Sequence, residues 1–327
     1  MKNSFDGSNV LITGGLGFIG SNLAAQLLAR GAAVTLLDSL IPDYGGNLCN
    51  IEPLRERVQL NISDVRDTYS MRHLVQGKDY LFNLAGQTSH LDSMVNPMPD
   101  LEINCRAQLS ILEACRACNP GIKIVFASTR QIYGKPERLP VDETHPLNPV
   151  DVNGINKMAG EKYHLLYSQV HGLKATALRL TNTIGPRMRI KDARQTFVGI
   201  WIRQLLEGAP IEVWGGEQLR DFTDVDDAVE AFLLAAASSE TSGEVYNLGG
   251  SEVIDLAHLA KLLVEVNGGG RYEIREFPAE RQAIDIGNYY SDFSKIREQL
   301  GWTPQRSLRQ TLEKTLAYYR DSLGKYL

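Results

Sequence analysis

The first half of the chain alternates between short apolar runs and longer segments in which apolar residues recur every three or four positions. Short apolar runs predict buried strands, and the longer period predicts amphipathic helices. Strands interleaved with helices in this way predict an α/β fold with a doubly wound parallel sheet. The predicted strands are 9–13, 33–38, 57–61, 79–84, 122–128, 174–180 and 244–248, and the helices between them are 18–30, 67–76, 100–118 and 154–171.

The residue pattern changes after about residue 180, where arginines, prolines and short apolar runs appear. Helices are predicted near 195–207, 225–238 and 255–266, and residues 211–224 are predicted to form a strand, a Gly-Gly turn and a second strand. A chain of 327 residues is long enough for about two domains. We therefore predict a sheet domain over residues 1–180 and a smaller α/β lobe over residues 181–327 that binds the substrate.

A glycine-spaced turn lies between the first predicted strand and the first predicted helix, with Gly14, Gly17 and Gly20 in the pattern G-x-x-G-x-x-G. The first glycine allows a tight turn, the second lets the backbone approach a pyrophosphate, and the third lets the helix pack on the strand. The N-terminus of the helix then offers free N–H groups to phosphates. This turn predicts a dinucleotide-binding site.

Acidic and small residues at the ends of the next strands extend that site. Asp38 ends the second strand, where a carboxylate accepts hydrogen bonds from ribose hydroxyls and repels a 2′-phosphate, so NAD is favoured over NADP. Asp64 can accept from the adenine amino group and Val65 can cover the ring. The residues predicted to bind the cofactor are Gly14, Gly17, Phe18, Ile19, Gly20, Asp38, Asp64, Val65, Leu84, Ala85, Gly86 and Lys157.

Composition narrows the class of protein and of partner. An apolar content of 43% with 22% charged residues is typical of a soluble globular protein. The net charge of −5, with no basic block, argues against nucleic acid or an anionic membrane as partner. No apolar run approaches the ~20 residues that span a bilayer, and the polar N-terminus has no signal-peptide core. We expect a cytoplasmic protein.

The cysteine pair Cys115-x-x-Cys118 could indicate a redox or metal site. It lies in a helical pattern with no second cysteine pair and no histidine nearby, which favours buried, small apolar residues on a helix. The other histidines also lack the spacing of metal ligands, so no metal is expected. These histidines are His73, His145, His164, His171 and His258.

Two further positions carry candidate chemistry. Thr129 ends the fifth strand, where its hydroxyl can hydrogen-bond a sugar oxygen beside the nicotinamide. Lys157 lies in the first turn of the following long helix, beneath the nicotinamide ribose. Its charge could hold the ribose hydroxyls and lower the pKa of a neighbouring acid.

Together these motifs resemble the extended short-chain dehydrogenase/reductase superfamily, and most of all its nucleotide-sugar epimerase/dehydratase branch. The resemblance rests on TGGLGFIG, Asp38, Asp64-Val65, STRQIYG, Lys157, RLTNTIGP at 179–186 and RDFTDVDD at 220–227. It implies a Rossmann-type sheet, NAD as cofactor, a nucleotide-sugar substrate and a homodimer formed by helices 100–118 and 154–171. The substrate contacts that it implies are His90, Thr129, Asn182, Arg220 and Arg281.

The chain departs from that family at the position of the catalytic acid/base residue. The family has Tyr-x-x-x-Lys, but the fourth residue before Lys157 is Asn153, whose amide does not titrate near neutral pH. Three interpretations stay open. Another group, such as Lys157 or His90, moves the proton while Asn153 positions substrate or water; the chemistry needs no tyrosinate or acts at a different sugar carbon; or the protein binds ligands without turnover.

The residues after Thr129 separate the reactions of the branch. The sugar 4,6-dehydratases carry an Asp-Glu pair there and the decarboxylases keep a Glu, whereas this chain has Arg130 and Gln131. The resemblance therefore favours an NAD-dependent epimerase that oxidises and re-reduces a sugar carbon, with Thr129, Asn153 and Lys157 as catalytic residues. The alternatives are a catalytically silent protein that binds NAD and nucleotide sugar, and a nucleotide-sugar reductase or dehydratase.

Overall fold

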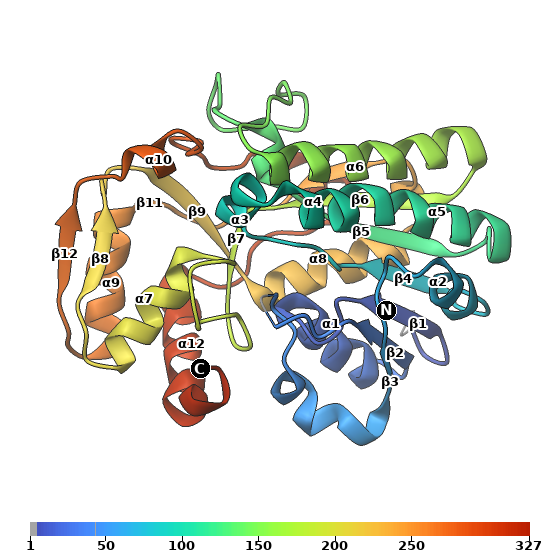
Figure 1. Cartoon of the computed structure of the whole chain (residues 1–327), viewed down its shortest axis with the longest axis horizontal. Coiled ribbons are helices and arrows are strands. Elements are labelled where there is room, and N and C mark those ends of the chain that lie inside the picture. Colours follow the sequence, from blue (N-terminus) through green and yellow to red (C-terminus); the bar gives the residue numbers. More distant parts are fainter. Residues whose placement is uncertain (1–4, 43) are drawn as a thin grey trace.

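A seven-stranded parallel sheet with the strand order β10-β6-β5-β4-β1-β2-β3 forms the centre of the molecule (Figure 1). The computed structural model describes residues 5–42 and 44–327. Every predicted strand of this sheet is present, within one residue at either end. The strands are β1 (Asn9–Thr13), β2 (Ala33–Asp38), β3 (Val58–Ile62), β4 (Tyr80–Asn83), β5 (Lys123–Thr129), β6 (Lys174–Leu180) and β10 (Val245–Asn247).

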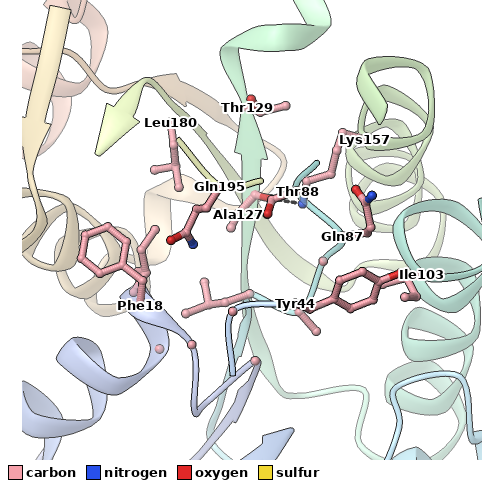
Figure 2. A pocket seen from close by; sticks show the side chains of 18 of the residues that line it. Phe18, Tyr44, Gln87, Thr88, Ile103, Ala127, Thr129, Lys157, Leu180 and Gln195 are labelled. Atoms are coloured by element: carbon pink, nitrogen blue, oxygen red, sulfur yellow. Dashed lines mark hydrogen bonds between the residues drawn. The ribbon is translucent and has the colours of Figure 1, made fainter. Parts of the chain in front are cut away.

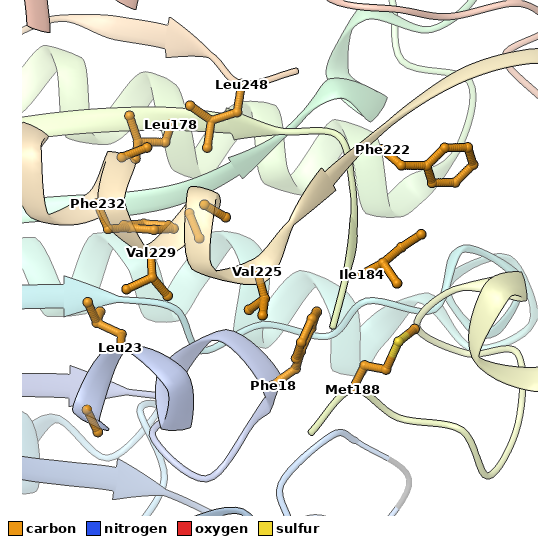
Figure 3. Close-up of a cluster of buried hydrophobic side chains, with 14 of the residues drawn as sticks. Phe18, Leu23, Leu178, Ile184, Met188, Phe222, Val225, Val229, Phe232 and Leu248 are labelled. Carbon is orange, nitrogen blue, oxygen red and sulfur yellow. The ribbon is translucent and has the colours of Figure 1, made fainter. Parts of the chain in front are cut away.

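Helices cover both faces of this sheet, which confirms the predicted doubly wound architecture. On one face α1 (Phe18–Ala29) packs against α8 (Val225–Ala237), and on the other α2 (Thr68–Leu74), α5 (Ala107–Cys118) and α6 (Val152–His171) lie in sequence (Figure 1). The apolar side of α1 and α8 meets the sheet in one continuous core. Figure 3 shows Leu23 of α1 near Val229 and Phe232 of α8, and Phe18 of α1 near Val225.

The predicted helix 100–118 is divided into three pieces. A short helix α4 (Pro97–Asp100) runs into a π-helical turn (Leu101–Arg106) and then into α5, and α3 (His90–Val95) precedes them. A π turn holds one extra residue per hydrogen-bonded loop and is frequent at functional sites. Apolar periodicity does not reveal such a turn, because the flanking helices keep their 3.6-residue period.

The second lobe contains a three-stranded sheet, a two-stranded sheet and several helices. The predicted strands within 211–224 are both present, but they join different sheets instead of pairing with each other. The elements are β7 (Asn182–Ile184), β9 (Leu219–Asp224) and β11 (Val253–Asp255); β8 (Ile211–Trp214) and β12 (Tyr272–Arg275); and α7 (Phe197–Leu206), α9 (Leu256–Asn267), α10 (Ala279–Gln282), α11 (Ser294–Leu300) and α12 (Leu308–Ser322).

The chain returns to the main sheet after entering this lobe, because β10 pairs with β6 and α8 packs on β5 and β6. The domain boundary at residue 180 stays a prediction. The elements β10 and α8 come after that residue in the chain but pack with the first domain. Short 3-10 helices complete the connections, at Leu48–Arg57, Arg130–Tyr133, Ser239–Thr241 and Leu323–Lys325. No helix in residues 5–42 and 44–327 is long and apolar enough to cross a membrane.

Two residues with reactive side chains prove to be packing residues. Cys115 lies in the core between α5 and the sheet, where burial raises the pKa of its thiol to about 12. Tyr133 is fully buried and donates its hydroxyl to Asn247. The burial of Cys115 agrees with its interpretation as a small apolar residue on a helix, and Tyr133 is likewise a residue of the interior.

A buried ion pair joins α6 to the main sheet. Arg179 of β6 donates to both carboxylate oxygens of Glu161, at 3.0 and 2.6 Å, and Ser128 of β5 donates to the same carboxylate at 2.6 Å. The two charged side chains are 3% and 0% exposed, so water does not share in the pairing. Removing one partner would leave the other charge buried without compensation.

We predict that Glu161→Ala lowers the free energy of unfolding by about 3–5 kcal/mol. The matched control is Glu207→Ala, which removes an exposed i,i+4 partner of Arg203 and should cost less than about 1 kcal/mol. Urea unfolding followed by circular dichroism measures both. Equal losses for the two variants would contradict the assignment of the Arg179–Glu161 pair as the stabilising contact.

Candidate active site

A pocket of about 260 Å³ opens at the carboxyl edge of the main sheet, where the two lobes meet (Figure 2). Its walls come from the turn after β1, the ends of β2, β4 and β5, the start of α6, and residues of the second lobe near 180–183 and 195–196. All of the residues predicted to bind the cofactor line it, and so do Thr129, Asn153, His90 and Asn182. The structure thus brings together residues that the sequence scatters over more than 160 positions.

The glycine turn has the conformation that its sequence requires. Gly14 has φ +68° and lies against the backbone of Ala85, and a Cβ on Gly20 would lie 2.3 Å from the carbonyl oxygen of Gly14. Only glycines fit these positions. Gly17 is the N-cap of α1, so the first N–H groups of the helix face the pocket without intrahelical partners. This cradle fits the pyrophosphate of a dinucleotide.

The hydroxyl of Thr13 fixes the neighbouring strand end. It donates to the side chain of Asn83 at 2.8 Å and accepts the N–H groups of Leu84 and Ala85, each at 3.1 Å. The backbone of residues 84–86 is therefore held flat against the turn after β1. Small side chains at this point leave room for a planar ligand group.

Asp38 also lies in the pocket wall, at the end of β2. Its two carboxylate oxygens accept the N–H groups of Leu16 and Leu40, at 3.1 and 3.0 Å. Burial raises the pKa of this carboxyl, and the backbone hydrogen bonds oppose the shift. The oxygens keep further lone pairs for ribose hydroxyls.

At the opposite end of the pocket, three polar side chains surround the tip of β5. The Thr129 hydroxyl accepts from the N–H of Gln131 at 3.2 Å, which leaves its own proton available to a ligand. Arg130 donates to the amide oxygen of Asn182 at 3.1 Å and stacks 5.1 Å from the ring of Tyr289. Nη1 of Arg130 and Nδ2 of Asn182 are buried without a partner among the described residues. These donors suit acceptor oxygens of a ligand.

Asn153 is held in one orientation by a buried carboxylate. Its amide nitrogen donates to Asp100 at 2.7 Å and to the backbone and side-chain oxygens of Gln87 at 2.9 and 3.2 Å. Asn156 donates to the other oxygen of Asp100 at 2.8 Å. Because a carboxylate only accepts, the nitrogen of Asn153 must face Asp100, and only its oxygen can face the pocket.

Lys157 lies one turn further along α6. Its ammonium donates to the carbonyl oxygen of Ala127 at 2.8 Å and lies 4.8 Å from the ring centre of Phe126. Burial lowers the pKa of Lys157 to about 8, against the opposite effect of the charges of Asp100 and Glu161. A Cβ on Gly86 would lie 3.3 Å from this ammonium, so the glycine admits the lysine to the pocket.

A second polar pair enters the pocket at the start of α3. Nδ1 of His90 lies 2.8 Å from Oδ2 of Asp151, whose side chain is 0% exposed. Gln131 donates to the same carboxylate oxygen at 2.9 Å, and the other oxygen accepts from the N–H of Gly154. Asp151 is thereby both the N-cap of α6 and the partner of His90.

Arg220 and Arg281 lie outside the pocket lining. Arg220 is buried in β9 and donates to Asp285 at 3.1 Å and to the carbonyl oxygens of Leu219 and Gly287. Burial and the charge of Arg130 lower the pKa of Arg220 to about 10. Arg281 stacks 4.1 Å from the ring of Trp214. The contacts with the substrate that the resemblance implies for Arg220 and Arg281 stay predictions.

Several residues of the site were not identified from the sequence. Asp100, Asp151 and Gln87 act through partners that are more than 50 positions away, and Gln195 and Thr196 reach the pocket from the loop before α7. Asp151 alone could have been found, because an Asp before a helix start is a typical N-cap. No cluster of three or more potential metal ligands occurs in residues 5–42 and 44–327.

Comparison with known proteins agrees with this geometry. A UDP-glucose 4-epimerase of Mycolicibacterium smegmatis is 30% identical over 95% of this chain and 98% of its own length. The solved structure of UDP-glucose 4-epimerase from Thermotoga maritima with UDP-glucose has a TM-score of 0.87 and 31% identity, and covers 96% of this chain and 99% of that one.

A dehydratase is equally similar in fold. The structure of dTDP-glucose 4,6-dehydratase from Streptomyces venezuelae with NAD bound has a TM-score of 0.88 and 26% identity, and covers 97% of this chain and 98% of that one. The sequence profile described as the NAD dependent epimerase/dehydratase family matches residues 10–249, which include the glycine turn, Thr129, Lys157 and Asn182. The chain therefore belongs to the NAD-dependent epimerase/dehydratase family, with NAD as its cofactor.

Proposed function

We propose that the chain is an NAD-dependent nucleotide-sugar epimerase that oxidises a sugar carbon and returns the hydride to the opposite face. One observation carries the choice among the reactions of the family. The two side chains after Thr129, where eliminations need an acid pair, are Arg130 and Gln131. Gln131 donates a hydrogen bond to Asp151, and Arg130 donates one to Asn182. Neither side chain is a carboxylic acid, so neither position supplies the acid of an elimination.

The names of two relatives support the same choice. The similar proteins from Mycolicibacterium smegmatis and Thermotoga maritima are UDP-glucose 4-epimerases, and the second binds UDP-glucose. We therefore take a UDP-hexose as the first substrate class to test.

Each side chain has a task in this reaction. NAD supplies the hydride acceptor when it is bound. The glycine turn and Asp38 would hold the cofactor, and Lys157 would hold its nicotinamide ribose and bring a positive charge to the site. The Thr129 hydroxyl donates to the sugar oxygen. Asn182 and Arg130 bind acceptor oxygens of the sugar or diphosphate through their unpaired N–H groups.

A catalytically silent binding protein is the second candidate, and Asn153 is the observation that favours it. An amide whose N–H groups are committed to Asp100 and Gln87 offers only an acceptor and moves no proton itself. The rest of the site is complete around this one substitution, which favours an active enzyme.

We predict that the purified protein converts UDP-glucose, or another nucleotide sugar of a test panel, to its epimer. We also predict that Lys157→Ala lowers the turnover number. The loss is expected because the Lys157 ammonium lies in the pocket wall, where it would hold the nicotinamide ribose. Proton NMR for a second epimer is the measurement. No conversion by the native protein, together with conversion by Asn153→Tyr, would favour the silent protein.

We predict that NAD binds more tightly than NADP and that Asp38→Ala narrows the difference. The 2′-phosphate of NADP would meet the Asp38 carboxylate, whereas NAD offers hydroxyls to it. Calorimetric titration with each cofactor gives the ratio of the NADP and NAD dissociation constants. The matched control is Asp64→Ala, which also lies in the pocket wall. Tighter binding of NADP by the unmodified protein would contradict the prediction.

We predict a homodimer in which α5 and α6 pair across a two-fold axis. Ile155 and Leu166 of α6 are 49% and 47% exposed, and eleven residues, about three helical turns, place them on one face. Leu166→Asp should give monomers in sedimentation, whereas Val253→Asp, at an equally exposed position of β11, should not. A monomeric unmodified protein would exclude this arrangement.

A further inference from the structure

We infer that His90, oriented by Asp151, is the acid/base of this pocket and exchanges the proton of the sugar hydroxyl. The inference rests on the proposed function, because it supplies the proton transfer that oxidation of a sugar carbon requires. It assigns to a histidine on α3 the task that falls to a tyrosine on α6 in the family that the sequence resembles.

The geometry places the imidazole correctly for this task. His90 lines the same pocket as Thr129, Asn153 and Lys157. Its Nδ1 lies 2.8 Å from the Asp151 carboxylate, and its side chain is 39% exposed, whereas that of Asp151 is fully buried. Nε2 has no hydrogen bond to any residue in the ranges described. Nδ1 therefore lies at ion-pair distance from a protein carboxylate, outside hydrogen-bond geometry, and Nε2 is available to a ligand.

Asp151 is held rigidly enough to orient the imidazole. One of its oxygens accepts from the Gly154 N–H at 2.6 Å, and the oxygen nearest His90 also accepts from Gln131 at 2.9 Å. Burial raises the pKa of Asp151, but His90 and these hydrogen bonds outweigh burial and leave it below its ordinary value. An ionised carboxylate 2.8 Å from Nδ1 favours the neutral tautomer that carries its proton on Nδ1 and leaves Nε2 as the acceptor.

The other polar groups of the pocket fit less well. Asn153 cannot take a proton, since its amide does not titrate. The ammonium of Lys157 donates to the carbonyl oxygen of Ala127, on the side of the sheet. The hydroxyl of Thr129 has no base within the hydrogen bonds that it makes, because its partner is the N–H of Gln131. Of these four side chains, His90 is the one that combines a titratable atom open to the pocket with a neighbouring carboxylate.

Other charged groups near His90 are themselves paired. The helix α3 packs against α4 and α6. On these elements Asp92 pairs with Arg194 at 2.9 Å, Asp100 is bound by two asparagines, and Lys157 by a carbonyl oxygen. Asp151 is thus the charged group in direct contact with the imidazole.

Nε2 of neutral His90 takes the hydroxyl proton while the hydride on the same carbon leaves to the cofactor, so the alcohol becomes a ketone and the ring becomes an imidazolium. The keto-sugar then rotates in the pocket so that its opposite face meets the cofactor. Hydride returns to that face of the carbon, and the imidazolium gives the proton back to the oxygen. The protein and the cofactor end the cycle unchanged.

The test compares His90→Ala and His90→Gln with the unmodified protein, using the nucleotide sugar that the NMR panel identifies. Both variants should lower kcat by about 100-fold or more, the usual contribution of a general acid/base. NAD content and affinity for the nucleotide sugar should stay close to those of the unmodified chain. Added imidazole should restore part of the activity of His90→Ala, whose cavity admits it, and none of that of His90→Gln.

Two further variants separate catalysis from structure. Asp151→Asn keeps a good N-cap for α6 and should lower kcat with little change in KM. His258→Ala is the matched control, because His258 forms the same kind of pair with Asp255, at 2.6 Å, on the exposed start of α9 outside the pocket lining. It should leave kcat unchanged.

Activity of His90→Gln close to that of the unmodified chain would overturn the inference and leave the proposed function intact. Loss of NAD together with activity in His90→Gln would also overturn it, since the residue would then be structural. Absence of conversion by the unmodified chain would instead refute the proposed function, and this inference would fall with it.

Discussion

All strands of the main sheet run parallel, so the carboxyl ends of β1, β2, β4, β5 and β6 lie along one edge. Right-handed crossovers through the helices impose this arrangement. The functional groups at these ends come within reach of one ligand, although they are far apart in the chain. The hydroxyl of Thr13 joins two of these ends directly by accepting the N–H groups after β4. The glycine turn, Asp38 and Thr129 would otherwise be isolated strand-end residues.

A second constraint is the buried carboxylate of Asp100. A buried charge is stable only where its oxygens are hydrogen-bonded, and here two asparagines of α6 meet that need. The contact ties α4 to the helix that carries Lys157, and it also commits the N–H groups of Asn153. The N–H groups of Asn153 thus belong to the scaffold of the pocket, and only its amide oxygen is left for a ligand.

The π-helical turn between α4 and α5 belongs to the same arrangement. It lies next to Asp100 and brings Asn104 to the carbonyl oxygen of Gln87, at 2.8 Å, so that the loop from β4 to α3 is held from two sides. That loop ends at His90. The polar contacts around α6 therefore form a connected set that links Asp100, Asn153 and the loop before His90. The epimerase-like and dehydratase-like relatives share the fold, so the reaction is decided at this level of detail.

The sequence by itself determined the architecture and identified the strand-end residues that line one end of the pocket. Strands 9–13, 33–38 and 174–180 match their predicted bounds, because apolar runs, caps and a glycine turn are local signals. Tertiary structure alone decided the π turn, the return of β10 to the main sheet, and the pairing of Asn153 with Asp100 and of His90 with Asp151. Residues 53 positions apart meet only through the packing of whole helices, which no local pattern encodes. The chemistry of the pocket depends on those distant contacts.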